Sequence, residues 1–327
     1  MKQRTTTIGI VAAASLALVA CGPQADTGEV DYPTGDIEML VGFPPGGQND
    51  VTARHFAEQL EEELDQTVLV VNREGGGGSI AAAEAYSASP DGYTLLFAPT
   101  GGFTAGVLLQ DVPYEIADFR SIEPVSENTF IVSVSADSGI EEFEDLQDLD
   151  GRVTYSAFGE GHATHLIGAG VAQHFDLDAD VATYPGGAPA LQPIINQDVD
   201  FGIQDIGSAL PRIESGELVP LAVSTDYVPD ALAELDEDVP SIAEFGLDDY
   251  LFAGSQALAV PADTPDEIVE TLREAASAIT ESEEHQAFVG EQGGAVPDVG
   301  GEEWFGEFMP AELDQFETLY NEHDVEY

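Results

Sequence analysis

Phe43-Pro44-Pro45-Gly46-Gly47-Gln48-Asn49-Asp50 is a glycine turn between an apolar run and a helical pattern. Residues 37–42 before it are predicted to form a short buried strand. Over residues 51–64 apolar side chains recur at the spacing of one helix face, which predicts an amphipathic helix capped by Asn49 or Asp50. Such a turn presents free backbone N–H groups and the positive end of a helix dipole, and both suit an anion. The stretch therefore predicts an anion-binding turn at the end of a strand.

A second turn of the same kind lies much later in the chain, at Tyr155-Ser156-Ala157-Phe158-Gly159-Glu160-Gly161-His162-Ala163-Thr164-His165. It also follows a predicted strand, residues 152–156. Ligands of open α/β sheets bind at the carboxyl ends of the strands. Two such turns on two separate sheets therefore predict a ligand held in a cleft.

The rest of the chain alternates short apolar runs with helical patterns. This βαβ rhythm predicts parallel sheets with helices on both faces, and 327 residues are enough for two domains with separate cores. We expect strands at 68–71, 94–98, 130–134, 152–156, 181–184, 199–204, 218–224 and 252–260. We expect helices at 79–89, 139–149, 164–175, 188–196, 265–280 and 302–320.

The composition is extremely acidic, with a formal net charge of −55 and Lys2 as the only lysine. The acids are spread along the whole chain. This spread favours a surface adapted to a very salty medium over a local patch that recruits cations or basic partners. Molar salt shortens the Debye length to about 3 Å and screens such repulsion. The sequence shows no basic patch, so a nucleic-acid partner is excluded.

Residues 1–20 resemble an export signal, with a basic start and an apolar run too short to span a bilayer. Leu18-Val19-Ala20-Cys21 resembles a lipobox, which makes Cys21 the expected lipidation site. The alternative is an incidental cysteine behind an ordinary signal. Cys21 is the single cysteine, so neither an intramolecular disulfide nor a thiol catalyst is expected. Residues 21–35 are rich in Gly, Pro, Asp and Thr and are expected to form a flexible tether.

Several motifs, taken in order, resemble the tripartite tricarboxylate transporter receptors, also called Bug proteins. The first turn followed by Ala53-Arg54 looks like the signature of that family. The further matching segments are Val71-Asn72-Arg73 with the glycines at 75–78, Pro90-Asp91-Gly92-Tyr93-Thr94-Leu95-Leu96, Tyr184-Pro185-Gly186-Gly187-Ala188-Pro189-Ala190-Leu191, Ser208-Ala209-Leu210-Pro211 with Gly216, and Val239-Pro240-Ser241 with Glu244 and Gly246-Leu247. Any one motif is weak, whereas the ordered set, over residues 31–316, is specific.

The resemblance implies a type II periplasmic-binding-protein fold, in which two α/β lobes joined by crossing strands hold a ligand between them. The expected limits are 36–130 with 252–327 for the first lobe and 131–251 for the second. It also implies a monomeric receptor without cofactor or metal, outside the cytoplasm and anchored to the membrane through the lipid on Cys21. Such a receptor captures a small carboxylate and delivers it to the large and small integral-membrane subunits of a permease driven by an ion gradient.

The resemblance also implies a set of ligand-binding residues, in which backbone amides of the two turns hold one carboxylate. None of the arginines lies in either turn, so the attraction is expected to come from amide donors and helix ends. The expected ligand-binding residues are Phe43, Pro45, Gly46, Gly47, Asn49, Asp50, Ser156, Phe158, Gly159, Gly161, His162, Ala163, Thr164, Gly186, Gly187, Ala188, Gln204 and Asp205.

The chain departs from the family pattern at its second turn. Ala157, Phe158 and His162 occupy places where serine or threonine hydroxyls are usual. Gln204-Asp205 stands where Asp-Asn is frequent. The loss of hydroxyl donors, together with an added ring and an added imidazole, indicates an acid that is bulkier or less charged than succinate or citrate.

Other functions find less support in the residues. His162 and His165 are spaced for a metal on one helix, but no third ligand lies within sequence reach. The glycines at 75–78 precede no Gly-Lys-Ser, which excludes a P-loop. An exported enzyme lacks support, because no Gly-x-Ser-x-Gly elbow is present. A sensor lipoprotein that signals to a membrane kinase has the same fold, and only its membrane partner distinguishes it from a transport receptor.

Overall fold

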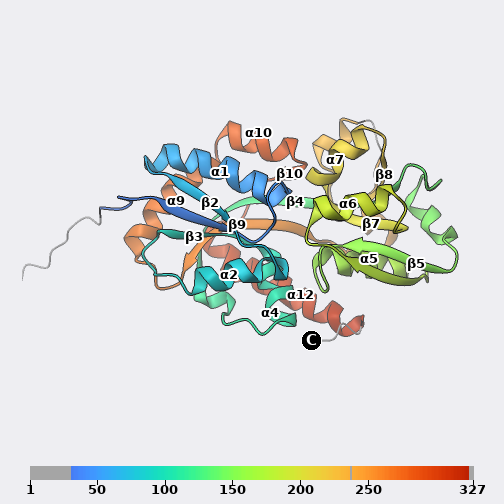
Figure 1. The fold of residues 1–327 in the computed structure, drawn as a ribbon, viewed down its shortest axis with the longest axis horizontal. Coiled ribbons are helices and arrows are strands. Elements are labelled where there is room, and N and C mark those ends of the chain that lie inside the picture. The colour runs from blue at the N-terminus through green and yellow to red at the C-terminus, as the bar shows by residue number, and fades with distance from the viewer. Residues whose placement is uncertain (1–30, 236–237, 324–327) are drawn as a thin grey trace, which may run out of the picture. The chain divides into compact units, whose positions relative to one another are not determined.

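One long strand, β4 (Phe119–Ser135), belongs to both sheets of the protein in a computed structural model that describes residues 31–235 and 238–323 (Figure 1). The expected signal peptide and Cys21 lie outside the described residues. From Tyr32 onward the chain forms one compact unit. The sheet order in that unit is β2-β1-β3-β9-β4-β7-β5-β6, with β8 and β10 also paired to β4.

The first sheet is built around β1 (Ile37–Val41), which pairs in parallel with β2 (Val68–Asn72) and β3 (Thr94–Pro99). Alternate residues of β1 face opposite sides, so Met39 and Leu40 enter different cores. One core contains residues of α1 (Gln48–Leu64) and α9 (Asp266–Thr280). The other contains residues of α2 (Ser79–Tyr86) and the side chain of Trp304. Helices therefore cover both faces, as the βαβ rhythm predicts.

The second sheet follows the same plan. In it β5 (Arg152–Ala157) pairs in parallel with β6 (Asp178–Thr183) and β7 (Phe201–Asp205). The end of β4 lies between β7 and β8 (Leu218–Val223), antiparallel to both. Its two cores include residues from three helices: α5 (Ala163–His174), α6 (Gly187–Ile195) and α7 (Ile206–Glu214).

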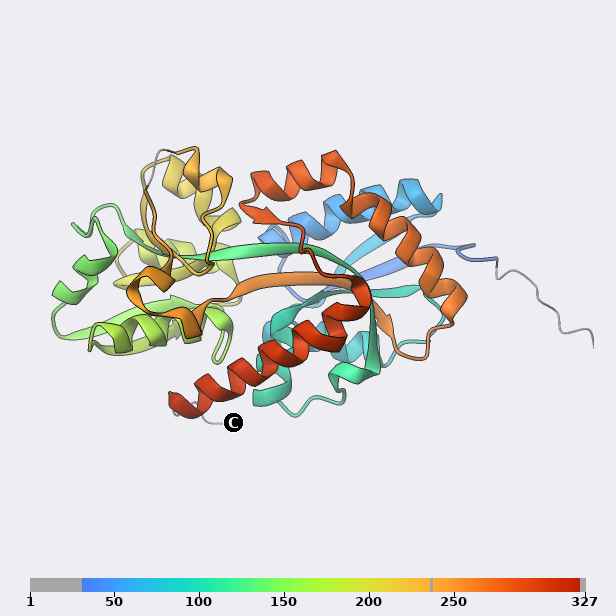
Figure 2. The ribbon, with the colours of Figure 1, turned by 180° about the vertical axis from the view of Figure 1, so that it is seen from behind.

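Two strands connect these halves. β9 (Ala253–Pro261) runs antiparallel to β4 from Phe119 to Thr129 and also pairs with β3. Helix α12 (Met309–Glu322) accompanies them, since Met309 packs in the first lobe and Phe316 in the second (Figure 2). The protein therefore has the two-lobed α/β architecture. The remaining α-helices and β-strands of the described residues are α3 (Thr100–Phe103), α4 (Ala105–Leu109), α8 (Asp230–Ala233), α10 (Glu283–Glu291), β10 (Gly294–Ala295) and α11 (Gly301–Glu303).

Two expectations about local structure were wrong, and a third was confirmed but covered too few residues. The helix expected at 139–149 is only a short 3₁₀ segment, Phe143–Asp148, which begins in a capping box formed by Glu142 and Asp145. The strand expected at 130–134 is the end of the much longer β4, whose first part contains buried polar residues such as Ser126 that hide it from an apolar pattern. Neither Asn49 nor Asp50 caps α1, because the N-cap residue is Gly47.

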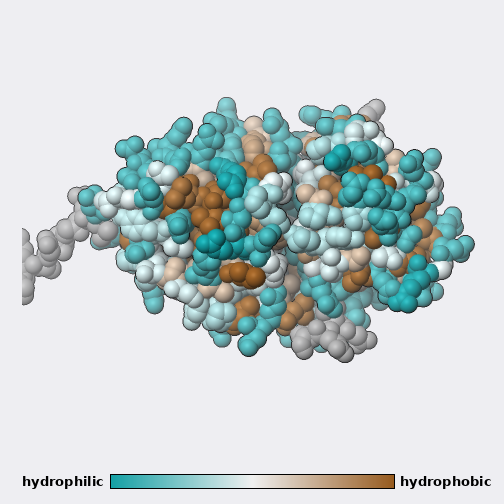
Figure 3. Space-filling model, viewed as in Figure 1, coloured by the Kyte–Doolittle hydropathy of each residue, from teal (hydrophilic) through white to brown (hydrophobic). Residues whose placement is uncertain are grey.

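The surface agrees with the acidic composition. Hydrophilic residues cover most of the face shown in Figure 3. Among the described residues, no helix has both the length and the apolar character that a membrane span requires. Large apolar side chains are exposed at Val51, Leu69, Ile80, Tyr86 and Tyr227.

Candidate functional site

The first glycine turn is held together by the carboxylate of Asp50. Its oxygens accept hydrogen bonds from Gly46 N at 2.9 Å and Asn72 Nδ2 at 2.8 Å, and they pair with Arg54 at 2.8 Å. Burial alone would raise the pKa of Asp50, but the hydrogen bonds from Arg54, Gly46 and Asn72 lower it below its usual value. The Asp50 side chain therefore shapes the first turn through these contacts.

The second turn is held by imidazoles. Gly161 N donates to His165 Nδ1 at 2.8 Å, and Thr164 N donates to His162 Nδ1 at 3.2 Å. The Thr164 hydroxyl accepts from Phe158 N at 2.9 Å. Burial, with a smaller contribution from a neighbouring histidine, lowers the pKa of His162 and of His165 to about 4. Both rings are therefore neutral near pH 7, and since Nδ1 accepts, Nε2 of each ring bears the proton.

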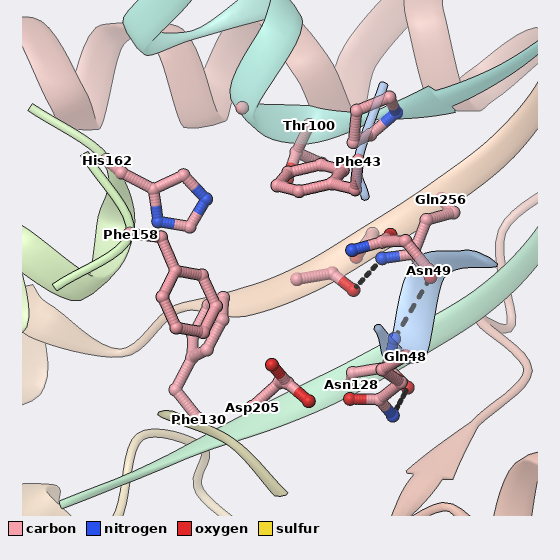
Figure 4. Close-up of a pocket in the computed structure, with 14 residues that line it drawn as sticks. Phe43, Gln48, Asn49, Thr100, Asn128, Phe130, Phe158, His162, Asp205 and Gln256 are labelled. Atoms are coloured by element: carbon pink, nitrogen blue, oxygen red, sulfur yellow. Dashed lines mark hydrogen bonds between the residues drawn. The ribbon is translucent and has the colours of Figure 1, made fainter. Parts of the chain in front are cut away.

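A cavity lies between the two turns, and residues of both lobes line it. Figure 4 shows the rings of Phe158 and Phe130 on one side and the amides of Gln256 and Asn49 on the other. The inner cavity measures about 20 Å³, which is room for about one water molecule. An adjoining hollow of about 170 Å³ lies between the first turn and the start of α6. Both hollows share Phe43, Gln48, Asn49, Phe158 and Asp205.

Several of the expected ligand-binding residues meet at these hollows. They are Phe43, Pro45, Gly47, Asn49, Phe158, His162, Gly186, Gly187, Ala188 and Asp205. The others do not line either hollow: Gly46, Asp50, Ser156, Gly159, Gly161, Ala163, Thr164 and Gln204. Ser156 and Gln204 are fully buried and hydrogen-bonded to each other at 3.0 Å, so they belong to the interior of the second lobe.

Sequence reasoning missed the contribution of three strands. Thr100 and Gly101 follow the end of β3, where Pro99-Thr100-Gly101-Gly102 is itself a strand followed by a glycine turn. The pattern that identifies the other two turns, a strand followed by glycines, is therefore also present here. Asn128 and Gln256 lie on the crossing strands and hydrogen-bond each other at 3.0 Å. The missed residues are Pro44, Gln48, Pro99, Thr100, Gly101, Asn128, Phe130, Pro189, Gly254, Ser255 and Gln256.

The electrostatics of the cavity depend on helix ends. The first turn of α1 lines both hollows, and the first turn of α6 lines the larger one. His162, the N-cap residue of α5, contributes its ring to the inner cavity. Helix N-termini carry partial positive charge and unpaired N–H groups. Each arginine that the structure describes is ion-paired with an acid: Arg54, Arg73, Arg120, Arg152, Arg212 and Arg273. Attraction of an anion is therefore left to amides and imidazole.

Asp205 is the acidic side chain in the lining. It is the N-cap residue of α7, and its Oδ1 accepts from Ser208 N at 2.9 Å. Burial raises the pKa of its carboxyl group. No group of three or more potential ligands in the described part of the chain could hold a metal ion, and His162 and His165 serve the turn instead.

Comparisons with known proteins agree with this geometry. The sequence pattern of the tripartite tricarboxylate transporter family receptor matches residues 52–296. A UPF0065 protein of Bordetella bronchiseptica is 32% identical over 277 residues, which are 83% of this chain and 79% of that protein. Protein BugT of Bordetella pertussis is 29% identical over 280 residues, 83% of this chain and 82% of that one.

Solved structures give the same result. R. palustris Rpa4515 with adipate has a TM-score of 0.83 and 26% identity, covering 90% of this chain and 99% of that chain. A periplasmic transporter structure has a TM-score of 0.81 at 27% identity, with the same coverage. These neighbours and the family are substrate-binding proteins and not enzymes. The chain therefore belongs to the tripartite tricarboxylate transporter receptor family, the Bug proteins, which are extracytoplasmic solute-binding receptors.

Proposed function

We propose that the protein captures a small organic carboxylate between its lobes and delivers it to the two membrane subunits of a tripartite tricarboxylate-type transporter. One observation carries the proposal: the first turn of α1 lines two adjoining hollows, and the His162 ring lines one of them and the first turn of α6 the other. Hydrogen bonds to a charged group contribute about 1.5–3 kcal/mol each and a helix end about 0.3–1 kcal/mol. After the cost of ordering the ligand, about 8 kcal/mol remains, which corresponds to micromolar affinity.

Capture requires the lobes to separate. The inner cavity of about 20 Å³ has room for about one water molecule, so an organic acid can enter it only if the lobes move apart. Residues 36–130 with 252–327 and residues 131–251 are the proposed moving parts, with β4 and β9 as the connection between them. Gln48 of the first lobe contacts the Gly207 region of the second, and separation would break this contact.

The cellular location of the protein is part of the same proposal. A lipid on Cys21 would hold the receptor at the outer face of the membrane, beside the permease subunits, as a monomer. The acidic surface is proposed to be an adaptation to high salt, so binding is best measured there.

A thermal-shift screen in molar salt tests the proposal. The panel contains mono-, di- and tricarboxylates, with the alcohols of the same carbon skeletons as uncharged controls. Stabilisation by one class of acid and not by its alcohol is the expected result. His162→Asn keeps a good N-cap but removes Nε2, and should weaken binding about tenfold, whereas the control His174→Asn, exposed on the same helix, should not. A folded protein that no acid stabilises would contradict the proposal.

A further inference from the structure

The connection between the two lobes contains a polar cluster outside the proposed binding site. β4 pairs with β9 as far as Thr129 and with β7 from Phe130 onward, so the strand changes lobes between these two residues. Glu127, just before this point, lies opposite Ser255 of β9, and the Ser255 hydroxyl donates to its Oε2 at 3.5 Å. Its Oε1 accepts from the Tyr227 hydroxyl at 3.2 Å. A carboxylate therefore lies where the chain passes from one lobe to the other.

A second carboxyl group, that of Glu312, faces the same place from α12. Figure 2 shows this helix running beside the crossing strands. Residues 255, 257 and 259 share one face of β9, and the latter two pack in the same core as Met309. The Phe316 ring packs on Phe252, with centroids 4.8 Å apart. Glu312 shares a helix face with Met309 and Phe316 and lies between them, so it faces β9 at the level of Ser255.

The Glu312 side chain is buried without a compensating base. It is 8% exposed, and its Oε2 has no hydrogen-bond partner within the described residues. The charged group that acts on it is Glu127 of β4, on which Asp226 acts in turn. Each arginine that the structure describes is paired with a different acid.

This environment keeps a proton on Glu312. Burial and, to a smaller extent, Glu127 raise the pKa of Glu312 to about 8. Burial raises the pKa of Glu127 as well, but the hydrogen bonds from Tyr227 and Ser255 favour its charged form. With the lobes together, Glu312 is therefore the neutral member of the pair near pH 7.

Separation of the lobes changes the surroundings of Glu312. α12 packs against both lobes at once, with Met309 in a core of the first and Phe316 and Tyr320 in a core of the second. The helix cannot keep both contacts when the lobes move apart, and Glu312 lies between them. Water then reaches its carboxyl group, and a hydrated glutamic acid titrates near its ordinary pKa of 4.5.

We propose, resting on the proposed receptor function, that Glu312 is a proton-binding site at the connection between the lobes, protonated with the lobes together and ionised with the lobes apart. Ligand capture takes up one proton from water, and ligand release returns it. Because the pKa is about 8 with the lobes together and near 4.5 with them apart, the preference for the lobes-together arrangement falls about tenfold per pH unit between these values. The affinity for a ligand falls with it as the pH rises.

Distance measurements between spin labels test the inference on the free protein. The labels are attached at Glu62→Cys in α1 and Asp198→Cys in the second lobe, both exposed, in a Cys21→Ser background. In molar salt, the ratio of lobes-apart to lobes-together molecules should rise at least about tenfold from pH 6 to 8. Glu312→Gln keeps the shape of the protonated acid and should hold the lobes together at both pH values. The control Glu317→Gln, exposed on α12, should follow the wild type.

Proton uptake gives an independent measurement. Adipate is titrated calorimetrically at pH 7 in buffers of different ionisation enthalpy, and the wild type should take up about one proton per adipate, whereas Glu312→Gln takes up about none. Glu127→Gln removes the like charge and should move the distance change to lower pH.

The distance measurement needs no ligand, so it decides alone where adipate does not bind. Wild-type distances that do not depend on pH, or the same pH dependence in Glu312→Gln, overturn the inference and leave the receptor function standing. Distances that change as expected, in a protein that no carboxylate of the thermal-shift panel stabilises, overturn the receptor function and leave the proton site standing.

Discussion

In the first turn a carboxylate organises the backbone, whereas in the second turn two neutral imidazoles do so. Asp50 accepts from the N–H of Gly46, and His165 accepts from the N–H of Gly161. Both glycines have a left-handed φ, +83° and +73°, so each turn combines a left-handed glycine with a side-chain acceptor four residues later. The same local geometry is therefore reached with a charged group in one lobe and an uncharged one in the other.

The acceptor side chains of the two turns, Asp50 in the first and His162 in the second, take up protons over different pH ranges. The pKa of Asp50 lies below its usual 3.8, so its contribution is complete above that pH and is lost only as the pH falls further. The pKa of His162 falls from 6.5 to about 4 on folding, so the unfolded chain takes up the proton first. Stability from the second turn is therefore lost between about pH 6.5 and 4. Acid should weaken the second turn before the first.

Asp50→Ala should produce the largest effect, because it removes the centre of the first turn. The variant loses hydrogen bonds from Gly46, Asn72 and Arg54 to one buried charge, and should be destabilised by about 4 kcal/mol. Denaturant unfolding in molar salt measures the change. Glu58→Ala, exposed on the same helix, is the control and should lose less than about 0.5 kcal/mol. Equal losses would mean that Asp50 is not the organiser of the turn.

His162→Asn should change the pH dependence of stability. The wild-type free energy of unfolding is expected to fall steadily from about pH 6.5 to 4, and the variant should lose roughly 3 kcal/mol less over that window. Urea unfolding at a series of pH values measures both curves. His174→Asn, exposed at the end of α5, should follow the wild type. Parallel curves for all three proteins would show that His162 is accessible to protons in the folded state.

Phe43 and His162, at the tips of the turns, line the cavity, and the sequence indicates this position because a strand followed by glycines fixes where the turn must lie. Their contact with a ligand stays a prediction. The roles of Asp50 and Thr164 could not be read in the same way. A polar side chain near a free N–H satisfies the turn or a ligand equally well, and only the positions of Asn72 and Phe158 decide between them.

The crossing strands β4 and β9 contain cavity residues that could not be predicted from the sequence. Asn128 and Gln256 lie far apart in the chain, and each lies in a segment whose pairing partner no local pattern indicates. They meet because β4 and β9 are antiparallel, with Asn128 opposite Gly254. The register between β4 and β9 brings these two side chains into the cavity. That register depends on the whole sheet and not on the residues next to Asn128 or Gln256 in the sequence.

Gly161→Ala and Gly46→Ala should give the smallest effects and separate backbone strain from crowding in the two turns. Both residues need a positive φ, which costs an alanine about 1 kcal/mol. A Cβ on Gly46 would meet nothing within 4 Å, whereas one on Gly161 would collide with Leu109 and the Tyr320 hydroxyl. Gly161→Ala should therefore lose about 1 kcal/mol more than Gly46→Ala in denaturant unfolding. Equal losses would mean that α4 and α12 yield freely around the second turn, and that its shape depends on the imidazoles alone.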